Sequence, residues 1–384
     1  MGDPVEADTG QTWEGQRSTY DALRAHCAVA REDLKWVALG HAEVVAAATD
    51  ADVFSSKVTT RRAIPNSLDG AEHAAYRSVV DRYLTVERVE REEPQCRRHA
   101  AAIIDALPRG VTVRTIADVG TPFAVRSQSS WLGWPSHHED ELVEWIQDNH
   151  AVSRSGSSDQ MREVAERFDQ IIRELLETRR TASPTDVTDV TGELLDDRVD
   201  GRPLTTEEIV SILRNWTAGD LGSLATSVGV LVHFLAVRPN IQRVVRRLVD
   251  ARDSTALTSA IEEILRIDDP FVANRRVATR AVSLGGVNIA AGEQLVLNWT
   301  AANRDPLVFE DPDRYDPEGN AGSNLVFGIG PHVCPGRALT LMELRVMLEE
   351  LLGRTTWIEL AQDQPAVREE PPVGGWARVP VVLR

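Results

Sequence analysis

Cysteine and positive charge are both scarce in this sequence of 384 residues. The cysteines are Cys27, Cys96 and Cys334, and no two of them stand at the spacing of a CxxC site or suggest a disulfide framework. This usage is typical of a reducing compartment. Lysine and arginine number 42 against 59 aspartate and glutamate residues, which gives a net charge of −17. Such an excess of acid argues against general nucleic-acid binding.

Long apolar runs are missing too. No stretch of 18 or more apolar residues stands out, and the opening MGDPVEADTG lacks the basic and then apolar pattern of a secretory signal. We therefore expect a soluble, cytoplasmic protein with no membrane partner. Residues 1–18 are expected to form a mobile N-terminal segment, followed by a single domain at 19–384.

Helical periodicity dominates what is present. Apolar residues recur three and four apart at 19–30, 141–150, 161–180 and 258–267. The longest candidate helix begins at Thr205 or Thr206 and ends before Pro239, and its apolar middle predicts burial in the core. The segment 277–299 alternates and turns at glycines, as short strands do. The sequence predicts a mainly α protein (α+β) with small β-sheets.

One cysteine stands in an unusual loop, FGIGPHVCPG, at positions 327–336. Glycine permits backbone shapes that other residues resist, and Pro335 suits the first position of the helix predicted after it. Cys334 would then lie at a helix N-terminus, where free N–H groups stabilise a thiolate. The alternatives are a buried free cysteine and, with less support, a zinc site, for which no cysteine or histidine pair stands nearby.

The loop as a whole is more specific than its cysteine. The residues Phe327, Gly328, Gly330, His332, Cys334 and Gly336 resemble the heme-binding loop of the cytochrome P-450 family, which has the form F-G-x-G-x-H-x-C-x-G. The resemblance implies the cytochrome P-450 fold, heme b as cofactor and Cys334 as the axial thiolate of its iron.

Further segments resemble the family in order along the chain. Glu263-Ile-Leu-Arg266 resembles its E-x-x-R helix, with Arg314 in FEDPDRYDP as the third charge of a structural triad. The resemblance also places four donors at the heme propionates, whose burial without cations would be costly. These four are His73 and Arg77 in DGAEHAAYR, Arg276 in RRVA, and His332.

The long central helix departs from the family's A/G-G-x-D/E-T-T/S pattern, in which an acid and an alcohol deliver protons for oxygen activation. Ala218 and Gly219 match and leave room for oxygen, but Leu221 stands at the acid position and Gly222 at the alcohol position. Asp220 and Ser223 share one helical face and offer a displaced relay. Thr217 or a substrate group is an alternative proton donor, and a purely structural role for Asp220 and Ser223 also stays open.

The resemblance implies a monooxygenase that oxidises, chiefly by hydroxylation, a small organic substrate of secondary metabolism, with electrons from a separate ferredoxin and ferredoxin reductase. A peroxygenase or coupling enzyme and a non-catalytic heme protein remain alternatives. Arg97 to His99 and Arg337 are candidate docking bases. The resemblance places the substrate wall at 64–66, 150–155, 216–217, 271–274 and 373–376, while Lys57, Arg61 and Arg62 are candidate partners for an acidic substrate.

Overall fold

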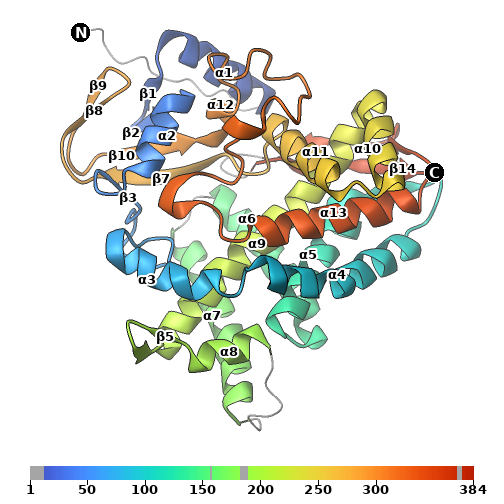
Figure 1. Cartoon of the computed structure of the whole chain (residues 1–384), viewed down its shortest axis with the longest axis horizontal. Helices are drawn as coiled ribbons and strands as arrows, with labels where there is room; N and C mark the ends of the chain where they lie inside the picture. Colours follow the sequence, from blue (N-terminus) through green and yellow to red (C-terminus); the bar gives the residue numbers. More distant parts are fainter. Residues whose placement is uncertain (1–12, 156–157, 182–188, 370–373) are drawn as a thin grey trace.

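Helices form most of the protein in the computed structural model, which describes residues 13–155, 158–181, 189–369 and 374–384. The helices are α1 (Trp13–His26), α2 (His41–Thr49), α3 (Gly70–Asp81), α4 (Val86–Ala106), α5 (Thr121–Leu132), α6 (Glu139–Ser155), α7 (Ser158–Thr181), α8 (Val190–Asp196), α9 (Thr206–Val237), α10 (Pro239–Ala251), α11 (Ser254–Ile267), α12 (Trp299–Ala302) and α13 (Arg337–Gly353), with a π-helical turn at Thr115–Gly120. The predicted mainly α architecture is confirmed (Figure 1).

The strands are short and form several small sheets. They are β1 (Val29–Glu32), β2 (Lys35–Ala38), β3 (Phe54–Ser55), β4 (Thr112–Arg114), β5 (Arg198–Val199), β6 (Arg202–Pro203), β7 (Ala273–Ala278), β8 (Val282–Leu284), β9 (Val287–Ile289), β10 (Gln294–Asn298), β11 (Ile358–Leu360), β12 (Val367–Arg368), β13 (Trp376–Arg378) and β14 (Pro380–Leu383). The largest sheet has the order β1-β2-β10-β7-β3, in which β10 runs parallel to β2 and antiparallel to β7.

The N-terminal boundaries differ from those that periodicity predicts. The first twelve residues of the segment 1–18 lie outside the described residues, and α1 already begins at Trp13. The helix predicted at 19–30 ends at His26, because Val29 and Ala30 pair with Ala38 and Val37 in the β1–β2 hairpin. The helical spacing of apolar residues therefore extended the predicted helix too far, because residues 29–30 belong to a strand that forms through long-range pairing.

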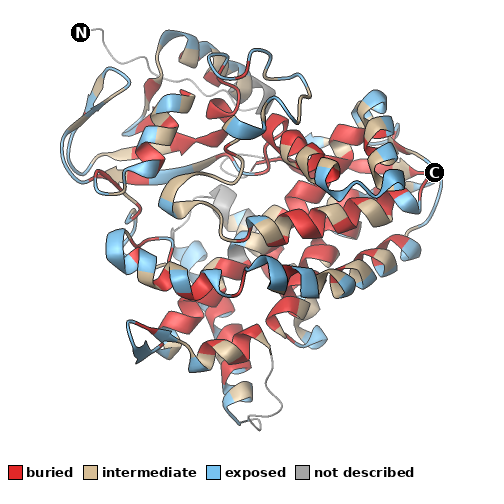
Figure 2. Ribbon diagram, in the orientation of Figure 1, coloured by how far each residue is buried: buried red, intermediate tan, exposed pale blue. Residues whose placement is uncertain are grey.

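Helix α9 passes through the core and closes one wall of the site. Thr205 and Glu208 form a reciprocal capping box at its start, and the helix ends at Val237, two residues before Pro239, as the sequence predicts. By length and composition this helix could cross a membrane, but 67% of its most apolar window is buried inside the protein. It packs against α5, α7, α11 and α13, where buried residues concentrate (Figure 2).

The paired charges of α11 are buried, as expected of a structural lock. Glu263 and Arg266 are 2% and 1% exposed and are joined by two hydrogen bonds of 2.8 and 2.9 Å. The prediction that the Arg314 side chain joins them is wrong: it is 67% exposed and faces Asp316, and only its backbone carbonyl meets Arg266. The Glu263 carboxylate already accepts four hydrogen bonds, so it has no need of a third charge.

Candidate functional site

A cavity of about 300 Å³ lies between α9 and the loop that carries Cys334. Its other walls come from α3, from β7, from residues 65–66 and from Trp299 at the start of α12. The structure brings all five predicted heme-binding residues to this cavity, although they are spread over 262 positions of the sequence: His73, Arg77, Arg276, His332 and Cys334.

The Cys334 loop needs two of its glycines for their backbone conformation. Gly328 and Gly330 have φ angles of 72° and 77°, in the left-handed region that other residues avoid. A Cβ atom on Gly330 would also lie 2.7 Å from the carbonyl oxygen of Ala48 in α2. The turn closes with a 2.9 Å hydrogen bond from the Cys334 N–H to the Phe327 carbonyl. The loop is thereby held tightly against the small β-containing region.

The end of the loop corrects one detail of the sequence interpretation. Helix α13 begins at Arg337, so Pro335 precedes the helix instead of opening it. Burial, together with the nearby Asp220, raises the pKa of the Cys334 thiol to about 12, and the Gly336 N–H opposes this increase only in part. Burial therefore opposes the stabilisation of a thiolate that the helix N-terminus provides. A metal ion bound at the sulfur would favour the thiolate, because it deprotonates a coordinating thiol.

The environment of Arg276 is typical of a side chain that binds an anionic ligand. Its side chain is buried, its one hydrogen bond goes to the carbonyl of Arg275, and no carboxylate lies within 4 Å of it among the described residues. Burial lowers the pKa of this guanidinium. A buried cation without a counter-charge is costly, so the site fits an anionic ligand group.

The other three donors surround the same part of the cavity. Arg77 donates to the carbonyls of Pro331 and Val333, at 3.1 and 2.8 Å, and so ties α3 to the Cys334 loop. The rings of His73 and His332 lie 4.2 Å apart, and burial lowers the pKa of both. Two guanidinium and two imidazole groups beside a cavity-facing thiol match the two carboxylates and the iron of heme b. The residues present therefore fit this cofactor.

The α9 wall carries three of the four predicted proton-relay residues. Gly219, Asp220 and Ser223 line the cavity, and open space lies beside the Gly219 Cα. Oδ2 of Asp220 is sealed from solvent without a hydrogen bond, and burial raises the pKa of this carboxyl to about 7. The Ser223 hydroxyl donates to the Gly219 carbonyl at 2.6 Å. Thr217 does not reach the cavity, because it is buried and its hydroxyl donates to the Leu213 carbonyl at 2.7 Å.

The structure adds a buried polar pair that sequence reasoning missed. Glu343 of α13 accepts from the Gln128 amide of α5 at 3.2 and 3.4 Å. Burial, and then the nearby Asp220, raise the pKa of Glu343 well above its usual range. The available signal was an acid inside the largely apolar run LTLMELRVML, where burial of a charge is expensive unless it is paired.

The substrate wall is predicted in part. Pro65, Asn66, Trp216, Phe271 and Asn274 line the cavity, whereas Ile64, Val272, Ala273 and the described residues 374–376 do not. Residue 373 and the side chains of His150 and of residues 153–155 lie outside the described set, and Ala151 and Val152 do not line the cavity.

The basic residues proposed for an acidic substrate are engaged elsewhere. Arg61 pairs with Asp169 at 2.8 Å, and Arg62 pairs with Glu72. Lys57 is exposed, and none of the three lines the cavity. Trp216 both narrows the cavity and packs in the core, edge-on to Trp131 with ring centroids 4.4 Å apart.

Comparison with known proteins agrees with this geometry. The cytochrome P450 family profile matches residues 154–381. The chain is 28% identical to cyclomarin C epoxidase CymV of Salinispora arenicola over 97% of each chain. It is 30% identical to 6-deoxyerythronolide B hydroxylase of Saccharopolyspora erythraea over 77% of this chain and 71% of the other. The open cytochrome P450 EryK of S. erythraea has the same fold, with a TM-score of 0.88 at 23% identity and 98% coverage of each chain. The chain therefore belongs to the cytochrome P450 family of heme-thiolate oxidoreductases.

Proposed function

We propose that this P450 monooxygenase inserts an oxygen atom into a small organic compound of secondary metabolism, with Cys334 as the thiolate ligand of its heme iron. The supporting observation is the cavity itself, which joins a thiol, two guanidinium groups, two imidazole groups and a wall whose one acid is Asp220 among the described residues. Relatives named as an epoxidase and a hydroxylase support the reaction class. Bound heme supplies the iron chemistry that activates dioxygen.

The functional test is turnover of a candidate substrate by the purified holoenzyme. Product should form when a ferredoxin, its reductase and a nicotinamide cofactor are supplied, and not when the redox proteins are left out. Product formation with hydrogen peroxide alone, at the same rate, would identify a peroxygenase instead. A substrate that binds but is never oxidised under either condition would indicate a non-catalytic heme protein.

Separate proteins are the proposed electron source, in the cytoplasm, because family members of this kind draw electrons from redox partners. Two of the bases predicted for docking are already paired with acids, whereas Arg98 is exposed and bonds to Gln95, with no carboxylate partner among the described residues. Arg97 pairs with Glu93, Glu349 and Glu350, and Arg337 pairs with Glu262. We therefore place partner recognition on the shape and mixed charge of this face and not on a basic patch.

Four side chains are proposed to hold the heme propionates: His73, Arg77, Arg276 and His332. Removing Arg276 would leave a buried carboxylate without its counter-charge, which costs about 3–5 kcal/mol for a buried pair. We expect Arg276→Ala to lose most of its heme on purification and to unfold at a lower temperature, with Arg77→Leu showing the same pattern. Heme content per chain and thermal unfolding measure both effects.

Arg275→Ala is the matched control for Arg276→Ala. Its side chain is exposed on the next position of β7, on the other face of the strand, so heme content should stay at the wild-type level. Wild-type heme content and stability in Arg276→Ala and Arg77→Leu would remove these two residues from the propionate site.

Asp220 is the proposed proton donor of the cavity, and Ser223 is the proposed second group of the proton relay. Asp220 lines the cavity and has an unpaired buried oxygen, while the Ser223 hydroxyl is already committed to a backbone carbonyl. We expect Asp220→Ala to lower the product formed per nicotinamide cofactor consumed severalfold, and Ser223→Ala to lower it less. Gly222→Thr, which restores the family's alcohol, should not raise this ratio. Wild-type coupling in both alanine variants would show that protons enter by another route.

A further inference from the structure

Two asparagines on the cavity wall have amide groups whose orientation the protein fixes. Asn215 Nδ2 lies 2.6 Å from the Ser211 carbonyl and 3.3 Å from the Ile64 carbonyl. Because carbonyl oxygens only accept hydrogen bonds, the N–H2 group of Asn215 must face them. Its Oδ1 atom is left without a partner among the described residues, on a side chain that lines the cavity.

Asn274 is fixed in the opposite sense. The Trp299 indole nitrogen lies 2.9 Å from Asn274 Oδ1, and an indole N–H only donates. The Asn274 N–H2 group is therefore the end without a partner in the described part of the chain, and both Asn274 and Trp299 line the cavity. The wall thus offers one oriented acceptor on α9 and one oriented donor on β7.

Charge is nearly absent from the rest of this wall. Apart from the four proposed propionate donors, no lysine or arginine among the described residues lines the cavity, and Asp220 is the one acid there. Ile212, Trp216 and Phe271 supply apolar surface beside the two amides. A carboxylate substrate would have to give up its hydration without gaining a cationic partner in the cavity. An uncharged substrate would not pay this desolvation penalty.

We propose that Asn215 and Asn274 select an uncharged substrate with amide groups, in which Asn215 accepts from a substrate N–H and Asn274 donates to a substrate carbonyl. This inference rests on the proposed function, since it names the substrate class of the same cavity. Sites built to hydrogen-bond a substrate reject analogues that lack the matching group far more strongly than apolar pockets reject a change of size. The amide pair therefore determines specificity, while the apolar wall supplies affinity.

The first test uses a matched set of three probes on the wild-type holoenzyme. Cyclo(Leu-Phe) has two amide N–H groups and two carbonyls, its N,N′-dimethyl derivative keeps only the carbonyls, and linear Leu-Phe is a zwitterion. Calorimetric titration should show the cyclic probe binding about tenfold more tightly than its dimethyl derivative, and the linear dipeptide most weakly. Equal affinity for the two cyclic probes, preference for the zwitterion or no binding of the cyclic probe would overturn the proposal.

Single substitutions test which asparagine binds the N–H group of the probe and which binds its carbonyl group. Asn215→Ala should bind the cyclic probe and its dimethyl derivative with nearly equal affinity, because the partner of the N–H is gone. Asn274→Asp keeps the oxygen that accepts from the Trp299 indole N–H but removes the N–H2 group that would donate to the probe carbonyl. This variant should bind both cyclic probes about tenfold less tightly. Asn288→Asp, the same change at an exposed position of β9, should match the wild type.

Two outcomes separate this inference from its alternatives. If Asn274→Asp loses heme while the remaining holoenzyme binds the probes normally, the Asn274 amide serves a heme carboxylate and the proposal is overturned. If the cyclic probe binds with the expected selectivity but is not oxidised with ferredoxin, reductase and cofactor present, the asparagine assignment stands and the monooxygenase proposal fails.

Discussion

The Cys334→Ala protein should show no trace of the reduced carbon monoxide band that gives the cytochrome P450 family its name. That band requires a thiolate ligand on the heme iron, and Cys334 is the one cysteine that lines the cavity among the described residues. The four propionate donors are unchanged in this variant, so part of the heme should still bind. The expected result is a holoprotein whose reduced carbon monoxide spectrum is that of a heme without a thiolate ligand.

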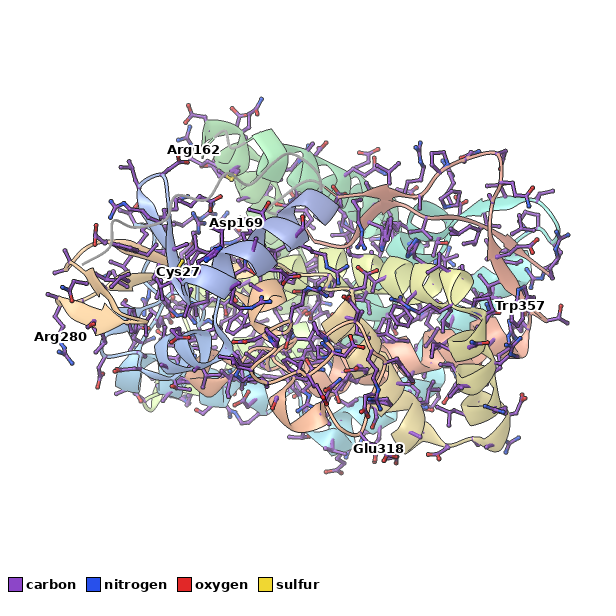
Figure 3. All side chains as sticks on the ribbon, turned by 90° about the horizontal axis from the view of Figure 1, so that it is seen from above. Cys27, Arg162, Asp169, Arg280, Glu318 and Trp357 are labelled. Carbon is purple, nitrogen blue, oxygen red and sulfur yellow. The ribbon has the colours of Figure 1, made fainter. Side chains whose placement is uncertain are left out.

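Cys27→Ala is the matched control for this experiment. Cys27, labelled in Figure 3, is a half-buried free thiol in the β-containing region. It donates to the Leu23 carbonyl and does not line the cavity. Its removal should leave the band at wild-type intensity. A full band in Cys334→Ala, or its loss in Cys27→Ala alone, would show that another residue ligates the iron.

The cysteine loop was predictable because its chemistry is local. Gly328 and Gly330 adopt left-handed backbone conformations, and Cys334 follows a few residues later. The ten residues 327–336 therefore determine most of the loop's conformation. The error in this segment was also local. A proline suggested the helix start, but α13 begins only at Arg337.

Side chains that depend on tertiary packing were less predictable. Thr217 has the right chemistry and the right helix, and it stands three residues before Asp220, but its side chain is packed in the core and its hydroxyl donates to the Leu213 carbonyl. Arg314 stands at the right distance in sequence but points to Asp316. The orientations of Asn215 and Asn274 depend on Ile64 and Trp299, which no local pattern connects to them.

The substitution with the largest expected effect on folding is Glu263→Ala. Arg266 would keep its buried position and its bonds to the Asn303 and Pro312 carbonyls but lose its counter-charge. Breaking one side of a buried ion pair costs about 3–5 kcal/mol, a large part of the stability of an ordinary protein. Glu263 also anchors the backbone N–H of Asp316 and the side chain of Asn320, so the segment before the Cys334 loop would loosen as well.

Glu262→Ala provides the neighbouring control, since Glu262 pairs with Arg337, whose side chain is 54% exposed. A pair of that kind contributes about 0–1 kcal/mol, so Glu262→Ala should unfold close to the wild-type temperature. In contrast, Glu263→Ala should yield little holoprotein and a clearly lowered unfolding temperature, while each molecule that does hold heme should turn over normally. The role of Glu263 is structural because its carboxylate lies in α11, outside the cavity lining. A Glu263→Ala protein that folds and loads heme like the wild type, yet cannot oxidise substrate, would make this residue part of the catalytic machinery instead.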